Sequence, residues 1–145
     1  MKISTKGRYA LRMMLDLAQN QGDGYIALKT VSERQNISKK YLEQIVPVLS
    51  RAGLLEANRG YNGGYRLAKE PKDYTVAEVL NLTEGSLAPV SCLEKDPASC
   101  ARSAFCPTLP LWKGLQKTIT DYLSSVTLGD LIENSISAGA DAYSI

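Results

Sequence analysis

Three cysteines are the residues of this chain whose chemistry is easiest to anticipate. They follow the pattern Cys92-x7-Cys100-x5-Cys106, in a segment rich in proline, serine and alanine. An odd number of cysteines argues against a closed set of disulfides. Thiolates gathered on one loop suit a soft metal or an iron–sulfur cluster. Neither gap is the two-residue spacing common in zinc sites, so the pattern favours metal chemistry without choosing the metal.

The chain contains no histidine, which excludes several kinds of catalytic and metal site. Ser–His and Cys–His catalytic pairs and histidine metal ligands are excluded. A cysteine nucleophile would depend on Lys, Arg or a helix N-terminus for its activation. Lys95 and Arg102 are the cations nearest the cysteines in the sequence, and nothing arranges them for that role. We therefore expect that the protein is not an enzyme. A zinc-stabilised protein-interaction module stays open as an alternative.

Length and composition describe an ordinary globular chain with an uneven charge. The 145 residues carry a net charge of +2, with 44% hydrophobic and 22% charged residues. No apolar run approaches the roughly 18 residues of a membrane span, and Arg8, Arg12 and Asp16 interrupt the N-terminus too early for a signal peptide. We expect a cytoplasmic protein with no membrane partner.

The charge is unevenly distributed along the chain. Residues 1–70 hold 12 basic and 6 acidic side chains, whereas residues 71–145 hold 5 basic and 9 acidic ones. The first half is therefore suited to binding a polyanion.

Hydrophobic spacing predicts three helices and a hairpin in the first half. A helix capped by Ser4 or Thr5 runs to about residue 19, a short one covers 28–35, and a third starts at residue 39. Residues 36–38 form a tight turn, since asparagine tolerates a left-handed backbone. Two strands, 54–59 and 65–68, flank a loop whose Asn-Gly pair signals a hairpin. This order is that of a winged helix-turn-helix.

The third helix turns a polar face away from its buried stripe of Leu42, Ile45, Val46 and Leu49. A DNA major groove admits one helix, and side chains near the N-terminus of that helix reach base edges. An arginine on the hairpin could enter a narrow minor groove. Modules that bind only protein share this outline. The candidate DNA-binding residues are Ser38, Lys39, Lys40, Tyr41, Glu43, Gln44, Arg59, Tyr61 and Arg66.

The second half contains the cysteines and a long helix. Thr75 caps a fourth helix, an irregular stretch follows, and a long helix begins near Leu111 with an apolar face that runs to Val126. Thr127 caps a final short helix. We therefore expect a mainly α fold with a small β-hairpin. Its parts are a winged helix-turn-helix domain (1–83), a cysteine loop (84–110), the long helix with the short terminal helix (111–134) and a flexible tail (135–145).

Three segments resemble the Rrf2 family of bacterial transcription regulators. They are MKISTKGRYA at residues 1–10, SKKYLEQ at 38–44 and RGYNGGYRLA at 59–68, and the likeness runs to about residue 134. The resemblance implies a winged-helix regulator that binds a double-stranded DNA operator as a homodimer, joined through the long helix. In the family, the position matching Arg59 reaches the minor groove. The positions that lie at the major groove match Ser38, Lys40, Tyr41, Glu43 and Gln44.

The three cysteines resemble those of the cluster-binding branch of the family, of which the iron–sulfur assembly regulator IscR is typical. This likeness implies an iron–sulfur cluster, of the 2Fe-2S type, on Cys92, Cys100 and Cys106. IscR-type members space these cysteines by five and five residues and add a histidine three residues later; here the first gap is seven and that position is Leu109. Other members take an aspartate near the start of the partner's first helix, where this chain has Arg8. The fourth ligand is therefore unknown. It would have to be a carboxylate such as Glu94 or Asp96, a hydroxyl, a solvent molecule or an external thiol.

The resemblance also implies what the cluster does. The cysteine loop adjoins the start of the long helix, so binding or losing a cluster could shift the two recognition helices of a dimer. Half-sites lie about 34 Å apart along the duplex, and a coupling of about 1–3 kcal/mol is enough for a switch. We expect DNA affinity to report iron–sulfur status. A nitric-oxide-sensing or redox-sensing repressor of the same family is the alternative.

Overall fold

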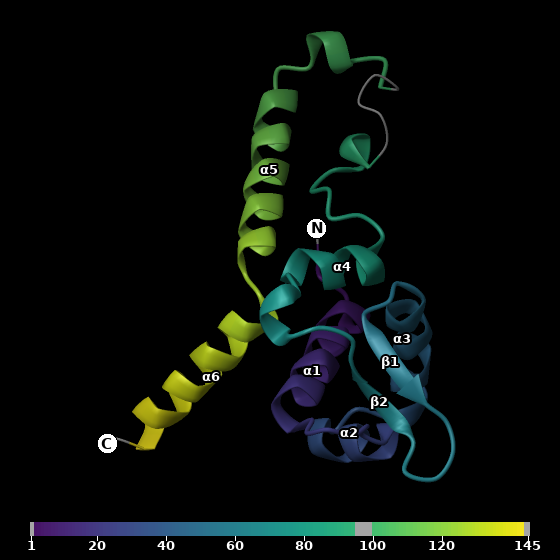
Figure 1. Ribbon diagram of the computed structural model, residues 1–145. Coiled ribbons are helices and arrows are strands. Elements are labelled where there is room, and N and C mark those ends of the chain that lie inside the picture. The colour runs from purple at the N-terminus through teal and green to yellow at the C-terminus, as the bar shows by residue number, and fades with distance from the viewer. Residues whose placement is uncertain (1, 95–99, 144–145) are drawn as a thin grey trace.

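Six helices and one β-hairpin make up the residues that this computed structural model describes, 2–94 and 100–143 (Figure 1). Short 3-10 turns cover Pro71–Asp73, Ser91–Leu93 and Ser103–Phe105. The mainly helical fold with a small hairpin confirms the expected fold class. The elements in chain order are α1 (Thr5–Asn20), α2 (Leu28–Gln35), α3 (Lys39–Arg51), β1 (Leu55–Asn58), β2 (Gly64–Leu67), α4 (Val76–Glu84), α5 (Leu109–Ser125) and α6 (Leu128–Tyr143).

The helix starts are fixed by side-chain caps. The hydroxyl groups of Ser4, Ser38 and Thr75 each accept a hydrogen bond from a backbone N–H in the first turn, over 3.1 Å in all three helices. Each of these bonds satisfies a donor that the helix itself leaves unpaired. Asn36 ends α2 at a φ of 53°, the left-handed conformation expected of it. The predicted caps and the tight turn before α3 are confirmed.

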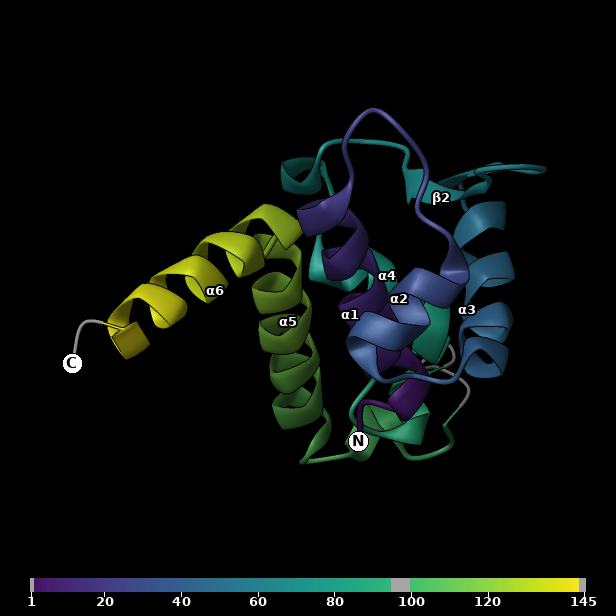
Figure 2. The same ribbon diagram turned by 90° about the horizontal axis from the view of Figure 1, so that it is seen from below.

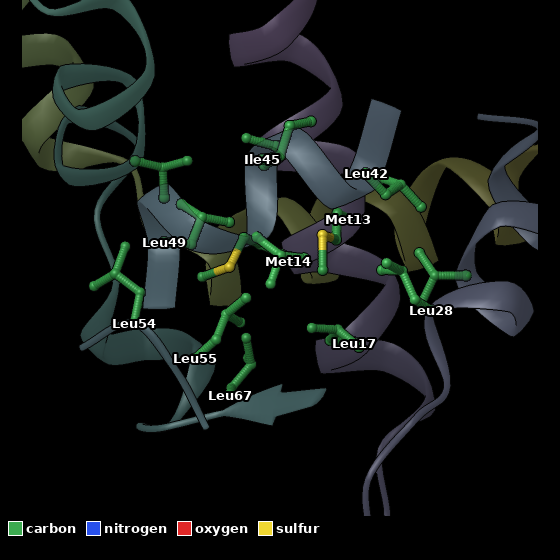
Figure 3. Packing of buried hydrophobic residues seen from close by; sticks show 14 of the residues in the cluster. Met13, Met14, Leu17, Leu28, Leu42, Ile45, Leu49, Leu54, Leu55 and Leu67 are labelled. Atoms are coloured by element: carbon green, nitrogen blue, oxygen red, sulfur yellow. The ribbon is translucent and has the colours of Figure 1, made fainter. Parts of the chain in front are cut away.

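The core lies between α1, α2, α3 and the hairpin (Figure 3). Met13, Met14 and Leu17 of α1 are fully buried, and they meet the apolar stripe of α3. That stripe is the one predicted from the spacing, since Leu42, Ile45, Val46 and Leu49 are all buried. Burying side chains of this size contributes about 1.5–3 kcal/mol each. The orientation of α3 is therefore set by its buried side.

The hairpin has a third strand-like neighbour that was not predicted from the sequence. β1 and β2 pair antiparallel, with Glu56 opposite Arg66. Ile26, from the α1–α2 connection, adds a bridge to β2: its N–H donates to the Tyr65 carbonyl over 2.9 Å and its carbonyl accepts from the Tyr65 N–H over 2.8 Å. Gly64 makes this possible, because an added Cβ would overlap the Ile26 backbone. The wing is thus anchored to the helical core.

The hairpin loop differs from a two-residue Asn-Gly turn. Asn62 has the expected positive φ of 62°, but Gly63 does not. Gly63 is needed for space instead, since a Cβ there would overlap the carbonyl oxygen of Asn58. The loop between the strands is five residues long and projects beyond the body of the domain (Figure 2).

The C-terminal helices leave the body on the side away from α3 (Figures 1 and 2). Thr127 caps α6 as predicted, its hydroxyl accepting from the Asp130 N–H over 3.0 Å while the Asp130 carboxylate accepts from the Thr127 N–H over 2.9 Å. The expected end of this helix near residue 134 was wrong, because α6 continues to Tyr143 and occupies most of the segment predicted as a tail, 135–145. Alanines at 138, 140 and 142 favour that continuation. None of the described helices is long and apolar enough to cross a membrane.

Candidate DNA-binding surface and cysteine loop

The N-terminal half of α3 presents a polar, exposed surface. Ser38, Lys39, Lys40, Glu43 and Gln44 are all exposed, opposite the buried stripe of the same helix. The hydroxyl of Ser38 is committed as the helix cap. The Lys39 ammonium lies 3.9 Å from the Glu43 carboxylate, an exposed pair one turn apart. This pair offsets part of the negative charge that Glu43 would bring to a DNA surface.

Tyr41 differs from its neighbours because it is half-buried against α1. Its ring meets that of Tyr9 edge-to-face, with the centroids 5.3 Å apart. The guanidinium of Arg12 lies over the Tyr9 ring at 5.2 Å and donates to the carbonyl and the side-chain oxygen of Gln35. The first turn of α3 is therefore supported by α1 and by the end of α2. The predicted role of Tyr41 at the DNA is combined with a packing role.

Asp16 is the buried centre of this support, and it is not among the residues predicted from the sequence. It is 1% exposed and accepts three hydrogen bonds, two from Arg34 over 2.7 and 3.0 Å and one from Gln35 over 2.9 Å. Hydrogen bonding to Asp16 raises the pKa of Arg34. An aspartate on an otherwise apolar helical stripe was the available signal, because buried carboxylates require paired donors. These contacts tie α2 to α1 beside the turn that leads into α3.

The candidate residues of the wing lie in two different places, the exposed loop and strand β2. Arg59 and Tyr61 are exposed on the loop, and Tyr61 is 95% exposed. Arg66 lies within β2 and not at the tip. Its guanidinium donates to Glu56 over 2.7 Å and lies over the Tyr25 ring at 4.5 Å. The hydrogen bond to Glu56 raises the pKa of Arg66.

A groove of about 430 Å³ separates α3 from the wing. Val46, Pro47 and Ser50 line its α3 side, and Arg59 and Tyr65 line its wing side. The exposed face of α3 and the tip of the wing are therefore two separate projections on one side of the domain. Such a shape allows a helix and a loop to reach two neighbouring grooves of one duplex.

The cysteine loop holds three free, half-buried thiols. Cys92 lies in the turn Ser91–Leu93, and Cys106 follows the turn Ser103–Phe105. The Sγ of Cys106 is 3.4 Å from the Thr108 hydroxyl, and this hydrogen bond lowers the pKa of the thiol. Within residues 2–94 and 100–143, no three Cys, Asp or Glu side chains come together as a metal site. Lys95 and Asp96, considered above, lie outside the described residues.

Residues 3–134 match the model of the Rrf2 family, described as iron-dependent transcriptional regulators. The chain belongs to the Rrf2 family. It is 47% identical over 133 residues to the helix-turn-helix-type transcriptional regulator NMA1593 of Neisseria meningitidis, covering 92% of this chain and 88% of that one. It is 40% identical over 132 residues to the regulator CymR of Bacillus subtilis, covering 90% and 89%. The structure of IscR from T. potens superposes with a TM-score of 0.76 at 39% identity, covering 95% and 90%.

Membership of the Rrf2 family confirms the resemblance found in the sequence and makes this chain a winged-helix transcriptional regulator that binds DNA. Two of its relatives, IscR of Aliivibrio salmonicida and CymR of Bacillus subtilis, are named as helix-turn-helix-type transcriptional regulators. Both names occur at similar identity, so similarity alone does not decide what Cys92, Cys100 and Cys106 bind.

The long helix α5 of this Rrf2 protein is only partly covered by the rest of the described chain. None of the 17 residues of α5 is buried, although the helix packs on α4. Leu111, Leu115 and Tyr122 are 61%, 41% and 67% exposed. They lie on one side of the helix at the predicted spacing, whereas Lys117 and Asp121 form an ion pair outside that side. An amphipathic helix this exposed presents a surface suited to a partner.

Proposed function

We propose that this protein binds a DNA operator as a homodimer and that an iron–sulfur cluster on Cys92, Cys100 and Cys106 controls its affinity. The observation that carries the DNA-binding part is the exposed polar half of α3 beside the exposed wing loop. Lys40 and Gln44 supply donors for bases or phosphates, and Arg59 supplies a cation for a minor groove. The N-terminus of α3, which Ser38 caps, would favour a phosphate of the DNA backbone.

The proposed dimer rests on α5. Leu111, Leu115 and Tyr122 form an apolar strip on one side of α5 that the rest of the described chain leaves exposed. A second copy of the same helix is the occupant that we infer, because two-fold symmetry would also place two α3 helices for the half-sites of a palindromic operator. Half-site spacing then depends on the angle between the two α5 helices.

The donors of the cysteine loop fit an iron–sulfur cluster in chemical type. They are three thiols of one loop, none is buried in the core, and none is joined in a disulfide. Thiolates are the ligands that such clusters prefer, and the hydrogen bond from Thr108 favours the thiolate of Cys106. When bound, a cluster would supply a redox-sensitive centre in the loop. Cys106 adjoins α5, so the loop can bias the position of that helix.

Anaerobic reconstitution with ferrous iron and sulfide tests the cluster. We expect visible charge-transfer bands, loss of these bands in a variant with all three cysteines changed to serine, and operator affinity that differs between the cluster-bound and cluster-free protein. One tight zinc per chain without such bands would instead indicate a zinc-stabilised module. A colourless protein that binds its operator equally under all conditions would refute the control by the cysteines while leaving DNA binding intact.

A nitric-oxide-sensing or redox-sensing repressor is the second candidate. The specific observation in its favour is the hydrogen bond between the Thr108 hydroxyl and the Cys106 Sγ over 3.4 Å. This hydrogen bond lowers the pKa of the thiol, and thiolates are the forms that oxidants attack. In this case mild peroxide would reduce operator affinity in the metal-free protein, and dithiothreitol would restore it. Insensitivity of the metal-free protein to peroxide would remove this candidate.

A further inference from the structure

The last residue of α4 holds the first residues of α1. The Glu84 carboxylate accepts hydrogen bonds from the Ser4 N–H over 3.1 and 3.3 Å and from the Ser4 hydroxyl over 2.6 Å. The same hydroxyl accepts from the Gly7 N–H as the cap of α1. Hydrogen bonds to a charged group are shorter and stronger than neutral ones. We call this set of contacts between Glu84 and Ser4 the clasp.

Gly7 brings the two helices into direct contact beside the clasp. It is buried, and a Cβ at this position would overlap the Glu84 carboxylate and lie 3.1 Å from a methyl carbon of Leu80. A larger residue at position 7 would therefore force α1 and α4 apart. The last turn of α4 and the first turn of α1 are held together by both hydrogen bonds and a close approach of the backbone.

The clasp lies between the cysteine loop and the DNA-binding surface. On one side, Gly85 ends α4 at a φ of 77° and begins the segment that leads to Cys92. On the other side, Tyr9 follows Gly7 by two residues and its ring contacts Tyr41 in the first turn of α3. One carboxylate thus joins the base of the loop to the helix that supports the recognition surface.

We propose that Glu84 is a positioning residue that transmits the state of the cysteine loop to α3 through Ser4 and α1. The inference rests on the proposed control by that loop. A rearrangement that turns the last residues of α4 would move the Glu84 carboxylate, and α1 would have to follow it or lose three hydrogen bonds. Tyr9 would then change its contact with Tyr41. This route runs within one protomer and does not require α5.

The first experiment needs no cluster. Iodoacetamide alkylates the cysteines of the metal-free, full-length protein, and backbone hydrogen exchange is followed in residues 5–9 and 39–44. In the wild type we expect alkylation to change exchange in both segments. Glu84→Ala should remove the response in both, and Glu84→Gln, which keeps oxygen and loses charge, should retain part of it. Absence of any response in the wild-type α1, or a full response in Glu84→Ala, would overturn the inference.

The matched control is Glu78→Ala. Glu78 lies on the same helix, and its carboxylate pairs with Lys69 over 3.5 Å and not with α1. It should respond as the wild type does. If Glu84→Ala unfolds, the comparison of Glu84→Gln with Glu78→Gln decides in its place: a smaller response in Glu84→Gln supports the clasp and equal responses contradict it.

The second experiment measures operator affinity with and without the reconstituted cluster. The wild-type ratio of the two dissociation constants tests the proposed function itself, and a ratio of one would refute cluster control while the exchange experiment still decides the clasp. Where the wild type shows a ratio in the roughly 5–150-fold range of allosteric coupling, Glu84→Ala should reduce it at least about threefold. A purely structural defect would weaken both forms equally and leave the ratio unchanged, which would count against the inference.

Discussion

The Arg34 guanidinium holds the Asp16 carboxylate by two hydrogen bonds, from Nη2 to Oδ1 over 2.7 Å and from Nε to Oδ2 over 3.0 Å. Asp16 is 1% exposed, whereas the Arg34 side chain is 37% exposed. The charge pair therefore reaches from the core of α1 to the surface beside the recognition turn. Gln35, which also donates to Asp16, precedes Asn36 at that turn. The orientation of α3 depends on this contact as well as on its apolar stripe.

Asp16→Asn should destabilise the protein strongly. Asparagine keeps the shape of the side chain but leaves the Arg34 charge without its partner, which should cost about 2–4 kcal/mol of stability. This is somewhat less than the loss expected for a fully buried pair, because the partly exposed Arg34 side chain can turn toward water. Urea denaturation measures the free energy of unfolding. The control is Glu56→Gln, which removes an equally short but exposed pair with Arg66 and should cost much less, because water screens that pair. Equal losses in the two variants would contradict the role of Asp16.

Ionisation of Tyr74 should destabilise the folded protein at alkaline pH. Its side chain is fully buried, its hydroxyl donates to the Leu54 carbonyl over 2.7 Å and accepts from the Lys69 N–H over 2.9 Å, and burial raises its pKa. Because the folded state favours the neutral phenol, its stabilisation is complete below the unfolded pKa of about 10 and is lost as pH rises through the higher folded value.

This dependence on pH can be measured by urea denaturation between pH 8 and 11. Tyr74→Phe should lower stability by about 1–3 kcal/mol at pH 8, because the Lys69 N–H loses its acceptor and the Leu54 carbonyl keeps only the Ala68 N–H as a donor. The decline of stability above pH 10 should be shallower in this variant. The control Tyr61→Phe changes a tyrosine that is 95% exposed and should reproduce the wild-type curve. A wild-type slope that persists in Tyr74→Phe would assign the decline to other groups.

Arg59→Ala should weaken operator binding by about 1–3 kcal/mol and reduce the salt dependence of binding, since an exposed wing cation is removed from the DNA. Arg66 is the matched comparison. Its guanidinium is engaged by Glu56 and Tyr25, so we expect Arg66→Ala to cost less than Arg59→Ala. Binding isotherms at several salt concentrations distinguish the two. If Arg66→Ala proves the more damaging change, the DNA must approach β2 and not the loop tip.

Glu43→Ala should relax the choice of site more than it weakens binding. A carboxylate repels phosphates but can accept from a cytosine amino group, so its removal reduces discrimination between bases by about 1–3 kcal/mol at one position. Lys39, 3.9 Å from Glu43, is freed in this variant and can compensate on the phosphates. Competition between two operators that differ at one C·G pair measures the effect. An unchanged preference would place Glu43 away from the bases.

The sequence predicted the parts of the fold that local chemistry controls. The caps at Ser4, Ser38 and Thr75 and the left-handed Asn36 follow from side-chain preferences within a few residues of each helix end. The stripe from Leu42 to Leu49 follows from helical periodicity. These signals do not depend on distant segments, so they could be found without the structure.

Contacts between distant segments could not be predicted from such local sequence patterns. Glu84 and Ser4 are 80 residues apart, and neither has a pattern that predicts the other. The bridge from Ile26 to Tyr65 depends on the absence of a side chain at Gly64, which in the sequence is one glycine of a turn. Periodicity separated the candidate DNA-binding residues of α3 from its buried stripe, but it did not predict that Tyr41 packs against Tyr9. The engagement of Arg66 with Glu56 depended on the strand register.

Tyr122→Glu should break the proposed dimer. Tyr122 is 67% exposed within the apolar strip of α5, and a buried carboxylate at a symmetric interface would face its own copy without a partner cation. Sedimentation should show monomers, and operator affinity should fall to that of a single half-site. Lys117→Ala is the control, because it alters a part of the same helix outside the apolar strip, where Lys117 pairs with Asp121, and should remain dimeric. A Tyr122→Glu protein that sediments as a dimer would show that another surface joins the two copies.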